Sequence, residues 1–227
     1  MKRLQSEMQI KQPIDVENSI NSGQVFLWRK NKEFWYGVNG QDILQVNKNG
    51  KIKSLKNYKT DFFRNNDDFD KIIKSISKDK IVKKAVRKYP GLRIIKQDPF
   101  QCLISFIVSS NSNIQKIKTN LENISQKFGE KIEYKNQEFF LFPDAKRLSK
   151  ASITEIKSCG VGYRAKFIKE ASKIFASEKI TFDDLRSSDY FDAKKKIRII
   201  PGIGNKVADC ILLFSLDKLE SFPLDKI

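Results

Sequence analysis

The 227-residue chain contains no histidine. This absence excludes histidine-based acid–base catalysis, catalytic triads that use histidine, and metal sites with histidine ligands. Cysteine is scarce as well, because Cys102, Cys159 and Cys210 are widely spaced and odd in number. The three cysteines therefore predict neither a disulfide framework nor a zinc site, and we expect a protein that works in a reducing, intracellular compartment.

Long apolar runs are also missing from the sequence. The first ten residues, MKRLQSEMQI, lack the apolar core of a signal peptide. No other run stays apolar over the length that crosses a bilayer. The sequence thus gives no reason to expect secretion or a membrane span.

Charge of one sign is in clear excess. Lysine and arginine number 44 against 27 acidic residues, which gives a net charge of +17. This excess favours a polyanionic partner such as nucleic acid. The alternative is a generally lysine-rich composition, in which the excess has no functional meaning. Hydrophobic residues make up 40% of the chain, enough for the core of one large domain or two modest ones.

Residues 1–60 have the pattern of an antiparallel sheet. Four aromatic or alternating segments favour strands: VFLW (25–28), EFWYGV (33–38), DILQV (42–46) and KIKSL (51–55). Asn39-Gly40 and Asn49-Gly50 separate the last three, and Asn-Gly is a strong signal for a tight hairpin turn. We predict a meander whose aromatic residues form a core between the sheet and a helix. A nucleic-acid stacking face is the less favoured alternative.

Residues 60–97 change to a helical pattern, which Pro90-Gly91 ends. We therefore predict a first domain over residues 1–97, an antiparallel sheet with flanking helices. Residues 98–227 have mainly helical spacing, so the predicted fold class is α+β with a helical second domain. In this domain an apolar helix from Asp98 is expected to be buried, and SSNSN (109–113) ends it before a basic helix.

The most informative stretch is 192–227, which has the pattern of a helix, a tight turn, a second helix and a loop. Pro201 ends the first helix, and Gly202 and Gly204 allow backbone angles that other residues avoid. Such a turn exposes backbone N–H groups at a helix N-terminus, where a DNA phosphate can bind. The alternative is a plain helix–helix corner.

Lys206 lies in the first turn of the second predicted helix, where the positive end of the helix dipole disfavours an ammonium group. A partly apolar pocket would act in the same direction. A neutral lysine amine is a nucleophile for Schiff-base chemistry. Asp225 follows nineteen positions later (225 − 206), behind Pro223. An amine and a carboxylate at one point that faces DNA are suited to breaking an N-glycosidic bond.

The segment PGIGNKVADC, followed by PLD, resembles the helix-hairpin-helix DNA glycosylases and is most similar to their 8-oxoguanine branch. Three further segments resemble that branch in the expected order: SGQVFLWR (22–29), DPFQCLISFIVSSNSNIQKI (98–117) and CGVGYRAKFI (159–168). The resemblance implies a bifunctional glycosylase/AP lyase that flips oxidised guanine out of duplex DNA into a pocket between its domains. It implies Lys206 as the nucleophile, Asp225 as the carboxylate that stabilises charge on the sugar, a monomer, and no metal or organic cofactor.

The resemblance also implies residues that hold the DNA. Asn111 would fill the gap left by the flipped base, and Tyr163 would wedge between bases. Arg164 would bind the orphaned partner base. Lys116 takes a place where the family usually has an arginine, so we expect weaker selectivity for cytosine opposite the lesion. Gly202 and Gly204 would bind phosphate. The alternatives are a polar loop at 109–113 and core packing for Tyr163.

For the damaged base, the resemblance implies that the Gly23 carbonyl meets the N7 hydrogen of 8-oxoguanine and that Cys210 lies against the ring face. The alternatives are a simple turn at Gly23 and a small buried thiol at Cys210. The family normally continues past this chain's last residue, Ile227, so we expect a C-terminal truncation. Two rival functions remain: a glycosylase of the same superfamily for another damaged base, and a non-catalytic DNA-binding module.

Overall fold

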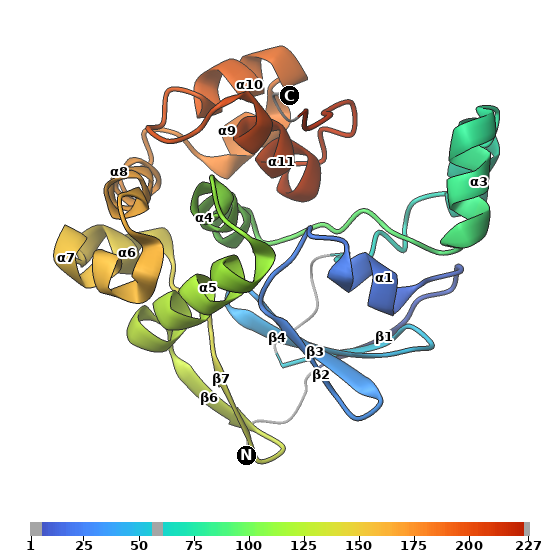
Figure 1. Ribbon diagram of the computed structural model, residues 1–227, viewed down its shortest axis with the longest axis horizontal. Coiled ribbons are helices and arrows are strands. Elements are labelled where there is room, and N and C mark those ends of the chain that lie inside the picture. Colours follow the sequence, from blue (N-terminus) through green and yellow to red (C-terminus); the bar gives the residue numbers. More distant parts are fainter. Residues whose placement is uncertain (1–5, 56–60, 225–227) are drawn as a thin grey trace. The chain divides into compact units, whose positions relative to one another are not determined.

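The computed structural model describes residues 6–55 and 61–224 (Figure 1). Two compact units divide the chain. The sheet unit holds residues 1–37 and 42–96, and the helical unit holds residues 38–41 and 97–227. The predicted fold class is confirmed, since an antiparallel sheet is followed by a mainly helical region. The predicted division into domains at residue 97 stays a prediction.

A five-stranded antiparallel sheet has the order β1-β5-β4-β3-β2. Its strands are β1 (Ser6–Gln9), β2 (Trp28–Asn31), β3 (Phe34–Asn39), β4 (Asp42–Asn47) and β5 (Lys51–Ser54). The meander from β2 to β5 agrees with the prediction, whereas β1 had not been expected and β2 begins only at Trp28. Trp28 pairs with Gly37, and a methyl group at position 37 would lie 2.0 Å from the indole ring. Glycine is therefore required at position 37, because any side chain would overlap the tryptophan.

The core of the sheet unit is apolar and aromatic. It includes Trp28, Trp35, Phe62 and Phe63, and helix α1 (Val16–Asn21) contributes Val16 and Ile20. This packing supports the core interpretation of the tryptophans. Two further helices, α2 (Phe69–Ile76) and α3 (Lys80–Lys88), complete the described part of this unit.

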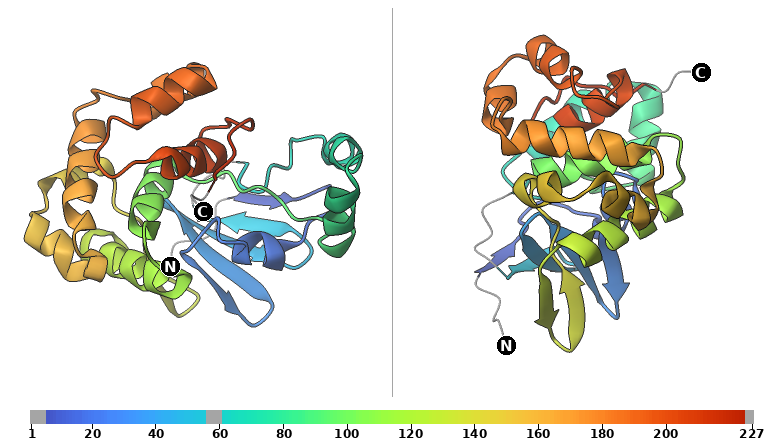
Figure 2. Two further views of the ribbon diagram at one scale, coloured as in Figure 1. Left: turned by 45° about the horizontal axis from the view of Figure 1, so that its top comes forward. Right: turned by 90° about the vertical axis from the view of Figure 1, so that its left-hand side faces the viewer.

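The helical unit is built around α4 (Pro99–Ser109). Asp98 caps this helix by accepting a hydrogen bond from the Gln101 backbone N–H at 2.8 Å. Every residue from Phe100 to Val108 is buried, as predicted. Helix α4 contacts three other helices of the unit, α5, α8 and α11 (Figures 1 and 2).

The remaining elements of the helical unit follow in chain order: α5 (Ile114–Phe128), β6 (Lys131–Tyr134), β7 (Gln137–Phe140), α6 (Ala145–Lys150), α7 (Ile153–Ile156), a π-helical turn η1 (Lys157–Val161), α8 (Arg164–Ala176), α9 (Phe182–Ser187), α10 (Tyr190–Ile197) and α11 (Asn205–Ser215). The β6–β7 hairpin had not been predicted. None of the helices within the described ranges has the length and apolarity needed to cross a membrane.

Candidate active site and nucleic-acid interface

The α10–α11 hairpin is shaped by its glycine turn. Helix α10 ends at Ile197, three residues earlier than the predicted Ile200, and α11 begins at Asn205. Gly202 has a φ of 87°, and a methyl group there would lie 2.5 Å from Cδ2 of Phe167. Both the backbone conformation and the close ring therefore require glycine at this position.

Gly204 is the N-cap of α11, and it offers no side chain to accept hydrogen bonds from the first turn. The residue is exposed, and a methyl group there would meet no atom within 4 Å. The helix thus starts at an open surface, where its N-terminal N–H groups can bind an anion.

Lys206 and Cys210 are one turn apart on α11. The Lys206 side chain is exposed, so the described residues do not form the apolar pocket that we expected around it. The Cys210 side chain is 5% exposed. An exposed amine and a buried thiol thus follow each other along the helix, with the amine next to the glycine turn.

Asp225 lies outside the described residues, but the segment before it is fixed to α11. Ser221 is 3% exposed, and its hydroxyl donates to the Asp209 carbonyl oxygen at 3.0 Å. The Asp209 carboxylate accepts hydrogen bonds from Tyr190 and Lys194, each at 2.8 Å. Sequence reasoning had not singled out Asp209. A charged residue inside an otherwise apolar helix segment was the signal, because a carboxylate is rarely buried without a partner.

Burial lowers the pKa of Lys194, but hydrogen bonds to Asp209 and Tyr190 oppose this effect. On balance the pKa of Lys194 is raised. Lys194 is therefore charged at neutral pH, and its contact with Asp209 links α10 to α11.

The segment 109–113 separates α4 from α5, as predicted. Asn111 is exposed and has a φ of 49°, in the left-handed region that residues other than glycine rarely adopt. Asn113 caps α5 by accepting from the Lys116 backbone N–H at 2.9 Å. The Lys116 side chain is exposed in the first turn of that helix.

A second glycine turn precedes α8. Gly160 and Gly162 have φ values of 87° and 59°. Tyr163 follows them with 56% of its surface exposed, so the core-packing alternative is wrong. Its ring lies 6.0 Å from the Phe167 ring, and Phe167 also faces Gly202. One phenylalanine therefore packs between the two glycine turns.

Arg164, in contrast to Tyr163, is buried, with 6% exposure. Its guanidinium donates to the backbone carbonyl oxygens of Ser110, Asn111 and Val161. The structure thus brings three of the predicted DNA-contacting residues together, namely Asn111, Tyr163 and Arg164. Whether each touches DNA stays a prediction.

Gly23 belongs to the sheet unit, where it has a φ of 83° after α1. The next residue, Gln24, is buried and holds this turn. Its side chain accepts from the Ile95 N–H at 2.8 Å and donates to the Arg93 carbonyl at 3.0 Å. The position of the Gly23 backbone is therefore fixed by contacts within the sheet unit.

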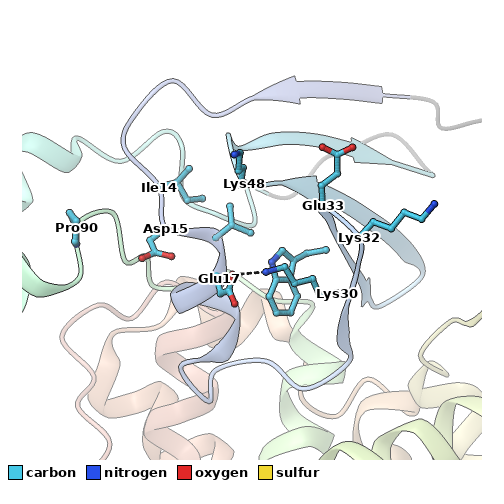
Figure 3. Close-up of a pocket in the computed structure, with 10 residues that line it drawn as sticks. Ile14, Asp15, Glu17, Lys30, Lys32, Glu33, Lys48 and Pro90 are labelled. Atoms are coloured by element: carbon cyan, nitrogen blue, oxygen red, sulfur yellow. Dashed lines mark hydrogen bonds and ion pairs between the residues drawn. The ribbon is translucent and has the colours of Figure 1, made fainter.

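A cavity of about 560 Å³ opens in the sheet unit (Figure 3). Its lining includes Trp35, Lys32, Lys48 and an ion pair between Lys30 and Glu17 at 2.7 Å. None of the predicted site residues lines it. Within residues 6–55 and 61–224, no group of three or more histidine, cysteine, aspartate or glutamate residues is arranged to hold a metal ion.

Two family models match adjoining parts of the chain. Residues 8–103 match the N-terminal domain of 8-oxoguanine DNA glycosylase, and residues 104–223 match the HhH-GPD superfamily of base excision DNA repair proteins. A probable N-glycosylase/DNA lyase of Methanothermobacter thermautotrophicus is 36% identical over 60% of this chain and 49% of its own length. The N-glycosylase/DNA lyase OGG1 of Arabidopsis thaliana is 36% identical over 61% of this chain and 39% of its own length.

The chain therefore spans about half or less of the length of these two curated relatives. A solved structure of Clostridium acetobutylicum 8-oxoguanine glycosylase/lyase, in complex with double-stranded DNA containing cytosine opposite 8-oxoguanine, has a TM-score of 0.88. It is 29% identical, and the match covers 96% of this chain and 78% of that chain. The chain belongs to the HhH-GPD superfamily of base excision DNA repair proteins, and it carries the N-terminal domain found in 8-oxoguanine DNA glycosylases.

Proposed function

We propose that the protein is a bifunctional DNA glycosylase/AP lyase that removes 8-oxoguanine from duplex DNA. The observation that carries this proposal is the position of Lys206, an exposed amine beside a glycine turn and an open helix N-terminus. The named activities of the relatives support the same reaction. Lys206 also disfavours the alkyl-base branch of the superfamily, which usually lacks this amine.

In the proposed reaction the lesion is first flipped out of the helix. The Lys206 amine attacks C1′ of the deoxyribose, and the bond from C1′ to the base breaks with its electron pair leaving on the base. Ring opening then gives a Schiff base between the lysine and C1′. Loss of a C2′ proton breaks the bond from C3′ to its phosphate oxygen, which nicks the strand on the 3′ side of the lesion. Asp225 stabilises positive charge on the sugar and helps to move the proton.

The glycine turns and the exposed loop residues supply the DNA contacts in this proposal. Phosphate binds at Gly202 and Gly204, where α11 starts without a side-chain cap. Asn111 and Tyr163 enter the duplex from exposed positions. Lys116 faces the partner strand. The Gly23 carbonyl and Cys210 contact the flipped base, and no metal or organic cofactor takes part. We further propose that the protein acts as a monomer on DNA inside the cell.

Trapping with borohydride tests the proposal, because reduction of a lysine Schiff base gives a covalent protein–DNA adduct. The full-length protein should form this adduct with a duplex that contains 8-oxoguanine. Lys206→Gln should abolish the adduct and keep duplex binding. An adduct that persists in the variant would show that another residue is the nucleophile. Duplex binding without any adduct in the wild type would favour the non-catalytic alternative.

A further inference from the structure

Arg164 is the first residue of α8, directly after the exposed Tyr163. Its side chain is almost fully buried, at 6% exposure, although it carries a permanent positive charge. A buried guanidinium needs hydrogen-bond acceptors, because an unpaired buried charge costs a large free energy. The acceptors that Arg164 finds are therefore informative about its role.

All the acceptors of Arg164 are backbone carbonyl oxygens. Nε donates to Ser110 at 2.8 Å, and Nη2 donates to Ser110 and also to Asn111, the latter at 3.0 Å. Nη1 donates to Val161 at 3.3 Å. A guanidinium has five N–H groups. Four of them are occupied, and one N–H of Nη1 is left without a partner among the described residues.

These contacts reach across the chain to the loop between α4 and α5. Ser110 and Asn111 are 54 and 53 positions away from Arg164 in sequence. Asn111 holds a left-handed backbone conformation with a φ of 49°. Asparagine adopts this conformation more readily than other residues besides glycine, so the bend itself does not require Arg164. At this bend, the Arg164 guanidinium donates hydrogen bonds to the backbone carbonyl oxygens of Ser110 and Asn111.

The Arg164 guanidinium also contacts the exposed ring of Tyr163. Its Cζ lies 4.7 Å from the centroid of the Tyr163 ring, within the range of a cation–π interaction. A single buried charged group therefore holds the Asn111 backbone and supports the Tyr163 ring. The guanidinium thus links the backbone that carries one exposed side chain to the ring of the other.

We propose that Arg164 is a positioning residue that presets the spacing of Asn111 and Tyr163 before they enter the duplex. This inference rests on the proposed function, in which those two residues insert into DNA. It precedes the role implied by the family resemblance, in which Arg164 binds the partner base, and concerns the protein before it meets DNA. Arg164 can offer a base one N–H while it holds all its carbonyl partners, and it must release one of them to offer two.

The first test needs no DNA and therefore stands apart from the proposed function. Arg164→Lys keeps the positive charge but loses the planar fork that spans three carbonyl groups. In NMR relaxation of the full-length protein, the order parameter of the Asn111 amide should fall from about 0.85 in the wild type to below about 0.6. The matched control is Arg147→Lys, an exposed arginine of the same unit, which should leave that value unchanged. An unchanged order parameter in Arg164→Lys would overturn the proposal.

The second test separates positioning from base reading. Duplexes carry 8-oxoguanine opposite each of the four bases and opposite a sugar without a base. If Arg164 sets the spacing, Arg164→Lys should weaken binding about ten-fold on all five duplexes. The hydrogen bonds that the variant loses lie within the protein, so their loss does not depend on the base opposite the lesion. A loss confined to cytosine would show that Arg164 reads the base. If Arg164→Lys lowers the melting temperature of the protein but leaves duplex binding unchanged, the hydrogen bonds of Arg164 only stabilise the fold. Either result would overturn the proposal, whereas failure of the proposed function would instead appear as a missing borohydride adduct in the wild type.

Discussion

At the scale of single residues, Asp209 is a buried carboxylate on the helix that carries Lys206. Its carboxylate is 4% exposed and accepts hydrogen bonds from two residues of α10. Its backbone carbonyl accepts from Ser221, four positions before Asp225 in sequence. Asp209, which lies on α11 with Lys206, is thus hydrogen-bonded both to α10 and to the segment that leads to Asp225.

Asp209→Ala should lower the free energy of unfolding by about 2 kcal/mol, because it leaves the partly buried Lys194 ammonium with Tyr190 but without its carboxylate partner. Chemical denaturation of the variant measures this loss. Asp183→Ala is the matched control, since Asp183 pairs with Arg186 at 2.6 Å but has a side chain that is 93% exposed. An exposed pair contributes at most about 1 kcal/mol. Equal losses in the two variants would contradict the role given to Asp209.

The pH dependence of this pair has a definite sign. Because the pKa of Lys194 is raised in the folded protein, the pair's contribution is complete at neutral pH. It is lost as the pH rises through the folded-state pKa of Lys194, above the ordinary range of lysine. Wild type and Asp209→Ala should therefore differ most in stability at neutral pH and converge at strongly alkaline pH. A difference that grows with alkalinity would contradict this linkage.

Lys116 gives a prediction about the base opposite the lesion. It is exposed in the first turn of α5, where the family usually has an arginine. Lysine offers a mobile point charge, whereas an arginine fork adds about 1–3 kcal/mol of discrimination per bidentate base contact. Lys116→Arg should therefore raise the preference for cytosine by roughly ten-fold or more in single-turnover excision opposite each base. If the arginine variant is no more selective than the wild type, Lys116 does not read the partner base.

At the scale of elements, the two glycines of the α10–α11 turn have different tasks. Gly202 combines a positive φ with a close phenylalanine ring, so Gly202→Ala should destabilise the protein by about 1–3 kcal/mol. Gly204 has an ordinary φ of −86° and open space around it. Gly204→Ala should therefore cost less than about 1 kcal/mol in stability. Thermal melts of the two variants, measured side by side, check the difference, and similar losses would contradict it.

The same turn shows how far the sequence alone could lead. Pro201, Gly202 and the apolar spacing around them were sufficient to predict the hairpin, because each signal is local. The contact between Gly202 and Phe167 could not be predicted, since 35 positions separate the two residues (202 − 167). The kink at Gly160 before α8 also involves a contact between residues far apart in sequence. A methyl group at Gly160 would lie 2.7 Å from Oδ1 of Asn120, a residue of another helix.

In the candidate site, too, local features could be predicted from the sequence, whereas contacts between distant residues could not. Lys206 was predicted from its own neighbours in sequence, whereas the wedge role of Tyr163 came from the family resemblance. Tyr163 is exposed, as that role requires. Arg164 was expected to bind the orphaned partner base, but two of its three acceptor residues, Ser110 and Asn111, lie more than 50 positions away. The pairing of its N–H groups with those backbone carbonyl groups depends on tertiary structure. Sequence patterns thus gave candidate residues for the site, but not the hydrogen-bond partners of those residues.

At the scale of the whole molecule, the net charge of +17 has two explanations. If the excess serves DNA binding, duplex affinity should fall steeply with salt, and each phosphate contact should add about 0.9 to the slope of log affinity against log salt. If the chain is merely lysine-rich, the positive charge attracts DNA only through its overall electrostatic field, without specific phosphate contacts. Binding of an undamaged duplex, measured over a range of salt concentrations, gives the slope. A flat response would exclude both the phosphate contacts and the DNA-binding role.

Two lysine variants then locate the contacts. Lys195 is exposed on α10, next to the glycine turn, whereas Lys84 is exposed on α3 in the sheet unit. Both substitutions to glutamine remove one charge, so a diffuse field would respond equally to each. A phosphate contact at the hairpin predicts that Lys195→Gln lowers the slope by about 0.9 and that Lys84→Gln leaves it nearly unchanged. Equal changes in the two slopes would assign the positive charge to composition, and the hairpin would then have no special part in binding DNA.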